Sequence, residues 1–379
     1  MEDVISDPVA VLGIDEKPAV SVPMRDVERE LNHQMNALQG AGPIHRARMS
    51  NLVIFCDSLV QSMMVTEQIP AISAVHPSRT ILLIGDPEGA KEVTAWVSVR
   101  PIGVGSKRYT CAEMVTLYAA GHAVERLPFA VRALLIGDLP VNLWWDAPLP
   151  PPLAGSLLFD LAETAQQIIY DSIGWPDPAR GVAATAGWME QIQRAGGRWR
   201  VASDLNWRRL KYWRRLLTQA LDPTAAAGAA ESATEIVVEH GPHASIQAWL
   251  LASWLTRHLG WSVQAGRITP GVEMAWKFKT KKGDAMVRIR RREQETSEVF
   301  RVRIACRIDD CAGALVISRE DAQRLSVQHE GTGTSPRTMT VPPHSPVDLV
   351  GRQLSDRERD EVFHESLAVA GVMAQSLLH

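Results

Sequence analysis

The hydrophobic period changes along the chain, and this change constrains the fold more than any other feature. In the first half, continuous runs of Val, Ile and Leu such as 51–56 and 80–84 are joined by segments with helical spacing. Such runs are typical of buried strands in a mostly parallel sheet. At 274–279, 285–290 and 299–304 the period is two, which predicts a half-buried antiparallel sheet. We therefore predict an α/β protein: a mostly parallel layered domain, then a smaller α+β domain with an antiparallel sheet.

The domain limits are predicted from length and composition. The 379 residues suit two domains of about 150–200 residues each. A run of small residues after Asp222-Pro223 breaks the strand–helix rhythm, and such residues bury little area, so this run is predicted as a linker. The predicted parts are an N-terminal arm over 1–45, an α/β domain over 46–222, a linker over 223–233 and a C-terminal α+β domain over 234–379.

Three further elements are predicted beside the linker and in the second domain. Residues 207–221 have the spacing of one amphipathic helix. Residues 326–347, rich in Gly, Thr, Ser and Pro, are predicted as a long mobile loop. A closing helix over 355–378 begins with an acidic turn, which suits the positive end of a helix dipole.

Composition narrows the classes of function. With 40 basic and 43 acidic residues, the net charge of −3 gives no overall field that would attract nucleic acid. No apolar stretch is long enough to span a bilayer and no signal peptide is visible, so we expect a cytoplasmic protein that binds no membrane. The four cysteines are too few for a disulfide framework and form no C-x-x-C, so Cys306 and Cys311 are expected to be reduced thiols.

Known catalytic motifs are absent from the sequence. There is no G-x-G-x-x-G, no G-x-S-x-G and no H-E-x-x-H. The nearest phosphate-binding string, Gly103 to Lys107, is better interpreted as a turn between strands, and His240 with His243 as a polar loop. We therefore expect no catalytic residues, no metal and no cofactor.

Five aspartates each close a predicted strand in the first domain. In a parallel sheet such positions gather at the carboxyl edge, where α/β proteins bind ligands. Asp is also a favoured helix N-cap, so capping is the competing interpretation. The five are Asp57, Asp86, Asp146, Asp171 and Asp204, and the last two stand in the most unusual surroundings.

Those surroundings are rich in tryptophan, of which the chain has 12 against 6 Phe. Trp144 and Trp145 end a strand, and Trp207 and Trp213 lie on the predicted 207–221 helix among several arginines. Aromatic anchors with arginines are typical of a docking surface. A packed amphipathic helix with a solvated face has the same pattern, so both interpretations stay open.

One face of the predicted antiparallel sheet is basic. Like charges on neighbouring strands repel, so an anionic group should compensate. We consider the acidic start of the closing helix (Asp356, Glu358, Asp360 and Glu361), an acidic partner protein, or a phosphate-bearing ligand. Nucleic acid is disfavoured because the aromatic residues alternate to the other face. The six basic residues are Lys277, Lys279, Arg288, Arg290, Arg301 and Arg303.

Three strings of the first domain resemble a known family. They are Asp138–Trp145 (DLPVNLWW), Ile168–Ser172 (IIYDS) and Ser203–Leu217 (SDLNWRRLKYWRRLL). Their order and spacing are similar to those of the glucose-6-phosphate dehydrogenase assembly protein family (OpcA). The resemblance is strongest over 46–222.

The resemblance implies a cytoplasmic partner of glucose-6-phosphate dehydrogenase. Such a protein is expected to be a non-catalytic allosteric activator or assembly factor that promotes the oxidative pentose phosphate pathway and NADPH supply. The candidate partner-binding residues are Trp144, Trp145, Asp171, Ser172, Asp204, Asn206, Trp207, Arg208, Trp213 and Arg214.

The alternative function is a sugar-phosphate- or nucleotide-binding α/β enzyme or sensor. Its ligand would lie at the strand edge near Asp171 and Asp204. A third hypothesis, a nucleic-acid binder, rests on the basic sheet face alone.

Overall fold

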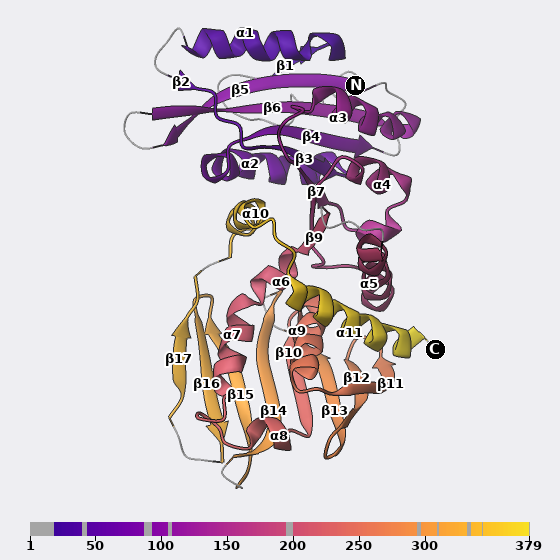
Figure 1. Ribbon diagram of the computed structural model, residues 1–379, viewed down its shortest axis with the longest axis vertical. Helices are drawn as coiled ribbons and strands as arrows, with labels where there is room; N and C mark the ends of the chain where they lie inside the picture. The colour runs from indigo at the N-terminus through magenta and orange to yellow at the C-terminus, as the bar shows by residue number, and fades with distance from the viewer. Residues whose placement is uncertain are drawn as a thin grey trace.

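The computed structural model describes residues 19–39, 44–86, 93–104, 108–194, 200–293, 297–308, 311–331, 335–342 and 344–378. Two sheets lie one beyond the other along the long axis of the molecule, and helices pack against each of them (Figure 1). Among these residues, no helix is long and apolar enough to cross a membrane. Gly105, Ser106 and Lys107 of the predicted turn lie outside the described residues.

The first sheet is mostly parallel, as predicted. Its strand order is β1-β5-β6-β4-β3-β7-β8-β9, with β2 beside β6. Only the β1–β5 and β5–β6 pairs are antiparallel. The strands are β1 (Val20–Val22), β2 (Ile44–His45), β3 (Ser50–Cys56), β4 (Ser78–Asp86), β5 (Thr94–Val104), β6 (Arg108–Ala120), β7 (Val141–Asp146), β8 (Gln167–Tyr170) and β9 (Val201–Asp204).

Helices cover both faces of this sheet, which is why strands such as β3 are buried along their whole length. One face packs against α1 (Val27–Gln39), α3 (Leu127–Leu134), α4 (Ser156–Ala162) and α5 (Pro178–Arg194). The other packs against α2 (Leu59–Val75) and α10 (Pro346–Ser355). Short 3-10 turns, η2 (Met24–Asp26), η3 (Gly121–Arg126) and η4 (Pro151–Leu153), precede α1, α3 and α4.

The described part of the predicted arm, from residue 19, packs on the first sheet. Strand β1 pairs with β5, and α1 buries Val27, Leu31 and Met35 against the core. Burial of these apolar side chains and the pairing of backbone groups hold the segment in place. The described residues 19–39 therefore pack on the first sheet, and the limit predicted at 45 stays a prediction.

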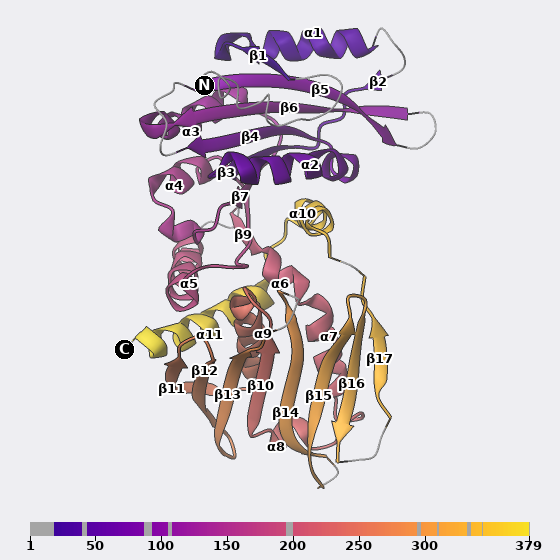
Figure 2. The same ribbon diagram turned by 180° about the vertical axis from the view of Figure 1, so that it is seen from behind.

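The second sheet is mostly antiparallel, again as predicted. Its order is β11-β12-β13-β10-β14-β15-β16-β17, and only β10 and β13 run parallel. One face packs on α7 (Lys211–Ala220), α9 (Ser245–His258) and α11 (Glu361–Leu378), whereas no described helix covers the other face (Figure 2). The strands are β10 (Glu235–His240), β11 (Ser262–Thr269), β12 (Glu273–Thr280), β13 (Gly283–Arg291), β14 (Val299–Ile308), β15 (Cys311–Asp321), β16 (Arg324–Glu330) and β17 (Arg337–Thr340).

The predicted loop over 326–347 is wrong for about half of its length. It contains most of β16, all of β17 and the start of α10. Strand β17 is a short, polar edge strand, so it lacks an apolar run that would reveal it. The sequence does indicate the start of α10, since Ser345 followed by proline is typical of a helix N-cap and first helical position. In the structure the Ser345 hydroxyl accepts a hydrogen bond from the Asp348 backbone N–H.

Two helix predictions also need correction. The predicted 207–221 helix is divided at Leu210 into α6 (Leu205–Arg209) and α7 (Lys211–Ala220). The carbonyl of Trp207 leaves the regular helix pattern there and accepts a bond of 2.7 Å from Arg214 Nη1. The closing helix is α11 (Glu361–Leu378), which a separate connector over 356–360 joins to α10.

The two halves of the chain are interleaved. Helix α10 packs on α2 of the first half, and α11 packs on both α5 and α9 (Ser245–His258). Helix α7 packs on β16, and the predicted linker contains α8 (Ala229–Ser232). The predicted limits at 222 and 233 stay predictions. These contacts favour a boundary directly after β9, where the chain leaves the first sheet and enters the second half.

Candidate functional site

The strand-end aspartates gather at one edge of the first sheet, as the sequence predicted. Strands β3, β7, β8 and β9 are adjacent and parallel, so the residues at their carboxyl ends lie close together. Burial, with the nearby charges of Asp171 and Asp57, raises the pKa of Asp146 to about 7. Burial and the charge of Asp171 raise the pKa of Asp204 to about 7 as well. These shifts follow because a buried carboxylate loses hydration and its neighbours repel it.

Asp86 ends β4, the strand beside β3. It accepts a hydrogen bond of 2.7 Å from the Tyr118 hydroxyl. Burial and this bond raise the pKa of Tyr118 to about 12. This bond links the carboxyl end of β4 to β6.

The edge carboxylates bind groups of the chain itself. Arg209 donates to both oxygens of Asp171, at 2.8 and 2.6 Å. Asp204 accepts from the backbone N–H of Asn206 at 2.8 Å and of Ser172 at 3.2 Å, so it caps α6. The Asn206 amide donates to the Ser172 hydroxyl at 3.0 Å, which brings four of the predicted residues into one network. The capping interpretation is thus confirmed for Asp204.

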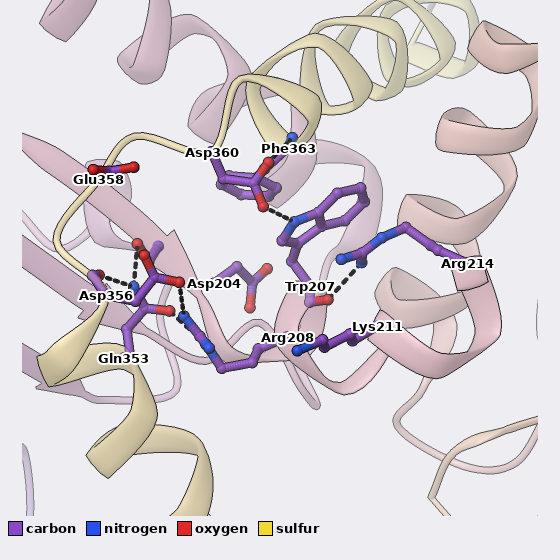
Figure 3. A pocket seen from close by; sticks show the side chains of 11 residues that line it. Asp204, Trp207, Arg208, Lys211, Arg214, Gln353, Asp356, Glu358, Asp360 and Phe363 are labelled. Carbon is purple, nitrogen blue, oxygen red and sulfur yellow. Dashed lines mark hydrogen bonds and ion pairs between the residues drawn. The ribbon is translucent and has the colours of Figure 1, made fainter. Parts of the chain in front are cut away.

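A cavity of about 200 Å³ opens beside Asp204. Its walls come from the 203–214 segment and from the 353–363 segment between α10 and α11 (Figure 3). Trp207 Nε1 donates to Asp360 at 2.6 Å, and Arg208 donates to Gln353 at 2.7 Å and to Asp356 at 2.8 Å. Sequence reasoning placed Trp207, Arg208 and Arg214 in the site but missed the second segment. Nothing in the local pattern of 353–363 indicates contact with residues about 150 positions earlier.

The tryptophans predicted as partner anchors are core residues. Trp144 and Trp213 are 3% and 1% exposed, and Trp145 stacks on Phe55 with ring centroids 4.4 Å apart. Trp207 is 5% exposed, and the Arg214 guanidinium lies 3.5 Å over its ring. In the free chain these rings pack in the core, so contact with a partner would require rearrangement of the core, and their docking role stays a prediction.

Every cation of the basic sheet face has a carboxylate partner within the sheet. Each of the six predicted residues forms an ion pair with a carboxylate on the same face: Lys277 and Lys279 with Asp284, Arg288 with Glu235 and Glu273, Arg290 with Glu273, and Arg301 and Arg303 with Glu330. The acidic start of the closing helix does not compensate this face, since Asp356 and Asp360 bind Arg208 and Trp207 instead. The alternation of Glu and Arg along neighbouring strands explains the pattern.

Other candidate chemistry finds little support in the described part of the chain. No group of three or more metal-binding side chains occurs there. His240 is buried and its Nδ1 contacts the Gly241 carbonyl at 2.7 Å. Cys306 is buried and Cys311 exposed, both as free thiols, and burial raises the pKa of Cys306.

The two sheets define a class of protein: a two-domain α/β protein with a mostly parallel first sheet and a mostly antiparallel second sheet. A putative oxidoreductase from Parabacteroides merdae has a similar fold, with a TM-score of 0.52 over 87% of this chain and 98% of that chain. At 9% sequence identity the likeness shows the fold alone.

Two family models match the sequence. Residues 69–186 match the glucose-6-phosphate dehydrogenase subunit N-terminal domain, and residues 200–367 match the corresponding C-terminal domain. The chain belongs to the OpcA glucose-6-phosphate dehydrogenase assembly family, which confirms the resemblance found in the sequence.

Two curated relatives are named putative OxPP cycle protein OpcA. The Nostoc punctiforme protein is 32% identical over 194 residues, which cover 50% of this chain and 39% of the relative. The Synechocystis protein is 28% identical over 203 residues, which cover 53% and 41%. The matched part thus spans about two fifths of the length of these relatives.

Proposed function

We propose that the chain binds glucose-6-phosphate dehydrogenase in the cytoplasm and acts on it as a non-catalytic activator or assembly factor. The observation that carries this proposal is the match of both halves of the chain to models described as subunit domains of that dehydrogenase. In this way the chain would promote the oxidative pentose phosphate pathway.

The state of the strand edge supports a non-catalytic role. In α/β folds this edge is where cofactors bind. Here Arg209 takes both oxygens of Asp171, and Asp204 caps α6. A group committed to such contacts is not available as a general base or as a ligand for ribose hydroxyls.

An activator must bind one state of its target more tightly than another. Its effect equals the ratio of the two affinities, so a tenfold change in the target's substrate affinity corresponds to about 1.4 kcal/mol. The chain would therefore shift the dehydrogenase toward its active conformation or oligomer by the difference between its binding free energies for the two states.

Helix α2 offers an apolar surface for this contact. The helix buries Val65, Ile69 and Ile72 on the sheet, yet its outer side is also apolar. Along that side Val60 is 70%, Met64 63% and Val75 64% exposed. A helix that is apolar all round is normally buried. Glu67 is the one charged residue in this helix, so a complementary surface would be apolar with one cationic group opposite Glu67.

Co-elution tests the proposed partnership. Purified chain and dehydrogenase are mixed and separated by size exclusion, with light scattering to give the mass of each peak. We expect one peak that contains both proteins and exceeds the mass of the dehydrogenase alone. Two unshifted peaks across a range of concentrations, with unchanged activity, would refute the proposal.

A further inference from the structure

The cavity beside Asp204 has the size of a small metabolite. Its volume of about 200 Å³ is below the roughly 300–1,000 Å³ typical of sites for drug-sized ligands. A nucleotide or dinucleotide would exceed it. Two segments far apart in sequence build the cavity, so a ligand would contact both at once.

One side of the cavity is cationic. Lys211 is exposed, and among the described residues it forms no ion pair. Arg214 is partly buried and donates to the Trp207 carbonyl at 2.7 Å, but it likewise has no ion-paired carboxylate in the described part of the chain. Burial lowers the pKa of Arg214 to about 10. The negative charge of Asp360 offsets the cost of burying Arg214 only in part, so a bound anion would stabilise this cation further.

The opposite side of the cavity is acidic (Figure 3). Asp360 is engaged by Trp207 Nε1 and by the backbone N–H of Phe363. One oxygen of Asp356 is engaged by Arg208 Nη2, at 2.8 Å. Glu358 is exposed and has no ion pair with a described residue. Carboxylates repel an anion but accept hydrogen bonds from hydroxyl groups.

A ligand that satisfies both sides carries an anionic group at one end and hydroxyl groups at the other. We propose that this cavity binds a sugar monophosphate, with the phosphate on Lys211 and Arg214 and the hydroxyls toward Asp356 and Glu358. Lysine and arginine are the side chains that bind phosphate in charge-assisted hydrogen bonds. This inference concerns the chain alone and does not depend on the dehydrogenase.

Binding is tested by isothermal titration and thermal shift on the full chain, with glucose 6-phosphate, glucose and inorganic phosphate as separate probes. We expect glucose 6-phosphate to bind saturably and to raise Tm, more strongly than either of the other two. No binding of glucose 6-phosphate would overturn the proposal. Equal binding of inorganic phosphate would also overturn it, because the hydroxyl contacts would then contribute nothing.

Variants locate the site. Lys211→Ala removes an exposed cation and should weaken glucose 6-phosphate binding at least about tenfold without changing the Tm of the free protein. Arg215→Ala removes an exposed cation of the same helix that lies outside the cavity, and should leave binding unchanged. Glu358→Ala should weaken glucose 6-phosphate binding but not phosphate binding. Equal losses in Lys211→Ala and Arg215→Ala would refute the site.

Discussion

At the scale of single residues, Arg209 controls the strand-end carboxylates. Its side chain is 11% exposed and pairs with Asp171, which is 18% exposed. Asp171 in turn acts on Asp146 and Asp204, whose pKa values it helps to raise. The charge balance of these carboxylates therefore depends on one guanidinium. In the sequence Arg209 is one of several arginines on the predicted 207–221 helix, and its spacing does not distinguish it from the others.

Removal of this guanidinium should destabilise the fold. Arg209→Ala leaves Asp171 unpaired beside two other acids, so the free energy of unfolding should fall by about 3 kcal/mol. Urea denaturation followed by circular dichroism measures the change. Arg215→Ala, at an exposed position, should change it by less than about 0.5 kcal/mol. Equal effects of the two substitutions would show that the Asp171 pair contributes little.

Asp146 should make stability depend on pH. Its pKa rises from 3.8 to about 7 on folding, so the folded state holds a proton that the unfolded state releases. The free energy of unfolding therefore falls as pH rises from about 4 to about 7. Above that range the contribution of Asp146 no longer changes with pH. Asp146→Asn removes the contribution of this group, while that of Asp204 remains, and should gain about 3 kcal/mol relative to the wild type between pH 5 and pH 8. Urea denaturation at several pH values measures this difference. Asp138→Asn, at an exposed turn, is the control and should not change the pH profile of the wild type. Parallel pH profiles for the wild type and Asp146→Asn would contradict the raised pKa of Asp146.

At the scale of elements, strands were predicted well and helix contacts poorly. The strand over 51–56 was predicted because burial on both faces gives a continuous apolar run. The strand over 274–279 was predicted because burial on one face gives an alternation of apolar and polar residues. The orientation of α6 and α7 was not found. Trp207 turns inward because Asp360 and Phe363, about 150 residues later, receive it, and local spacing holds no information on such a contact. The same reason hides the cavity that these segments form.

The exposed apolar side of α2 gives a prediction at this scale. The double substitution Val60→Lys with Met64→Lys places two cations on the proposed contact surface and should abolish co-elution with the dehydrogenase. Because both side chains are exposed, the Tm of the chain alone should change little. Val272→Lys, at an exposed turn of the second sheet with 60% exposure, serves as the matched control. Retained co-elution of the double variant would exclude α2 from the interface.

At the scale of the whole molecule, the two-sheet architecture followed from sequence but the interleaving of the halves did not. Helix α10 comes from the last part of the chain and covers the first sheet beside α2, while α11 bridges α5 and α9. Movement of the halves relative to each other would disturb these contacts, so the halves are mechanically linked. A partner bound at α2 would contact the helix on which α10 packs. A ligand bound near Asp204 would contact Gln353 and Asp356, at the end of α10.

The chain is proposed to change the activity of glucose-6-phosphate dehydrogenase without any turnover of its own. The direct measurement is the initial rate of NADPH formation at glucose 6-phosphate concentrations around KM, as purified chain is titrated into the dehydrogenase. We predict a saturable rise in rate or fall in KM, no rate with the chain alone, and a lost effect with the Val60→Lys and Met64→Lys double variant. A rate that stays constant at every concentration of chain, or turnover by the chain alone, would contradict the account.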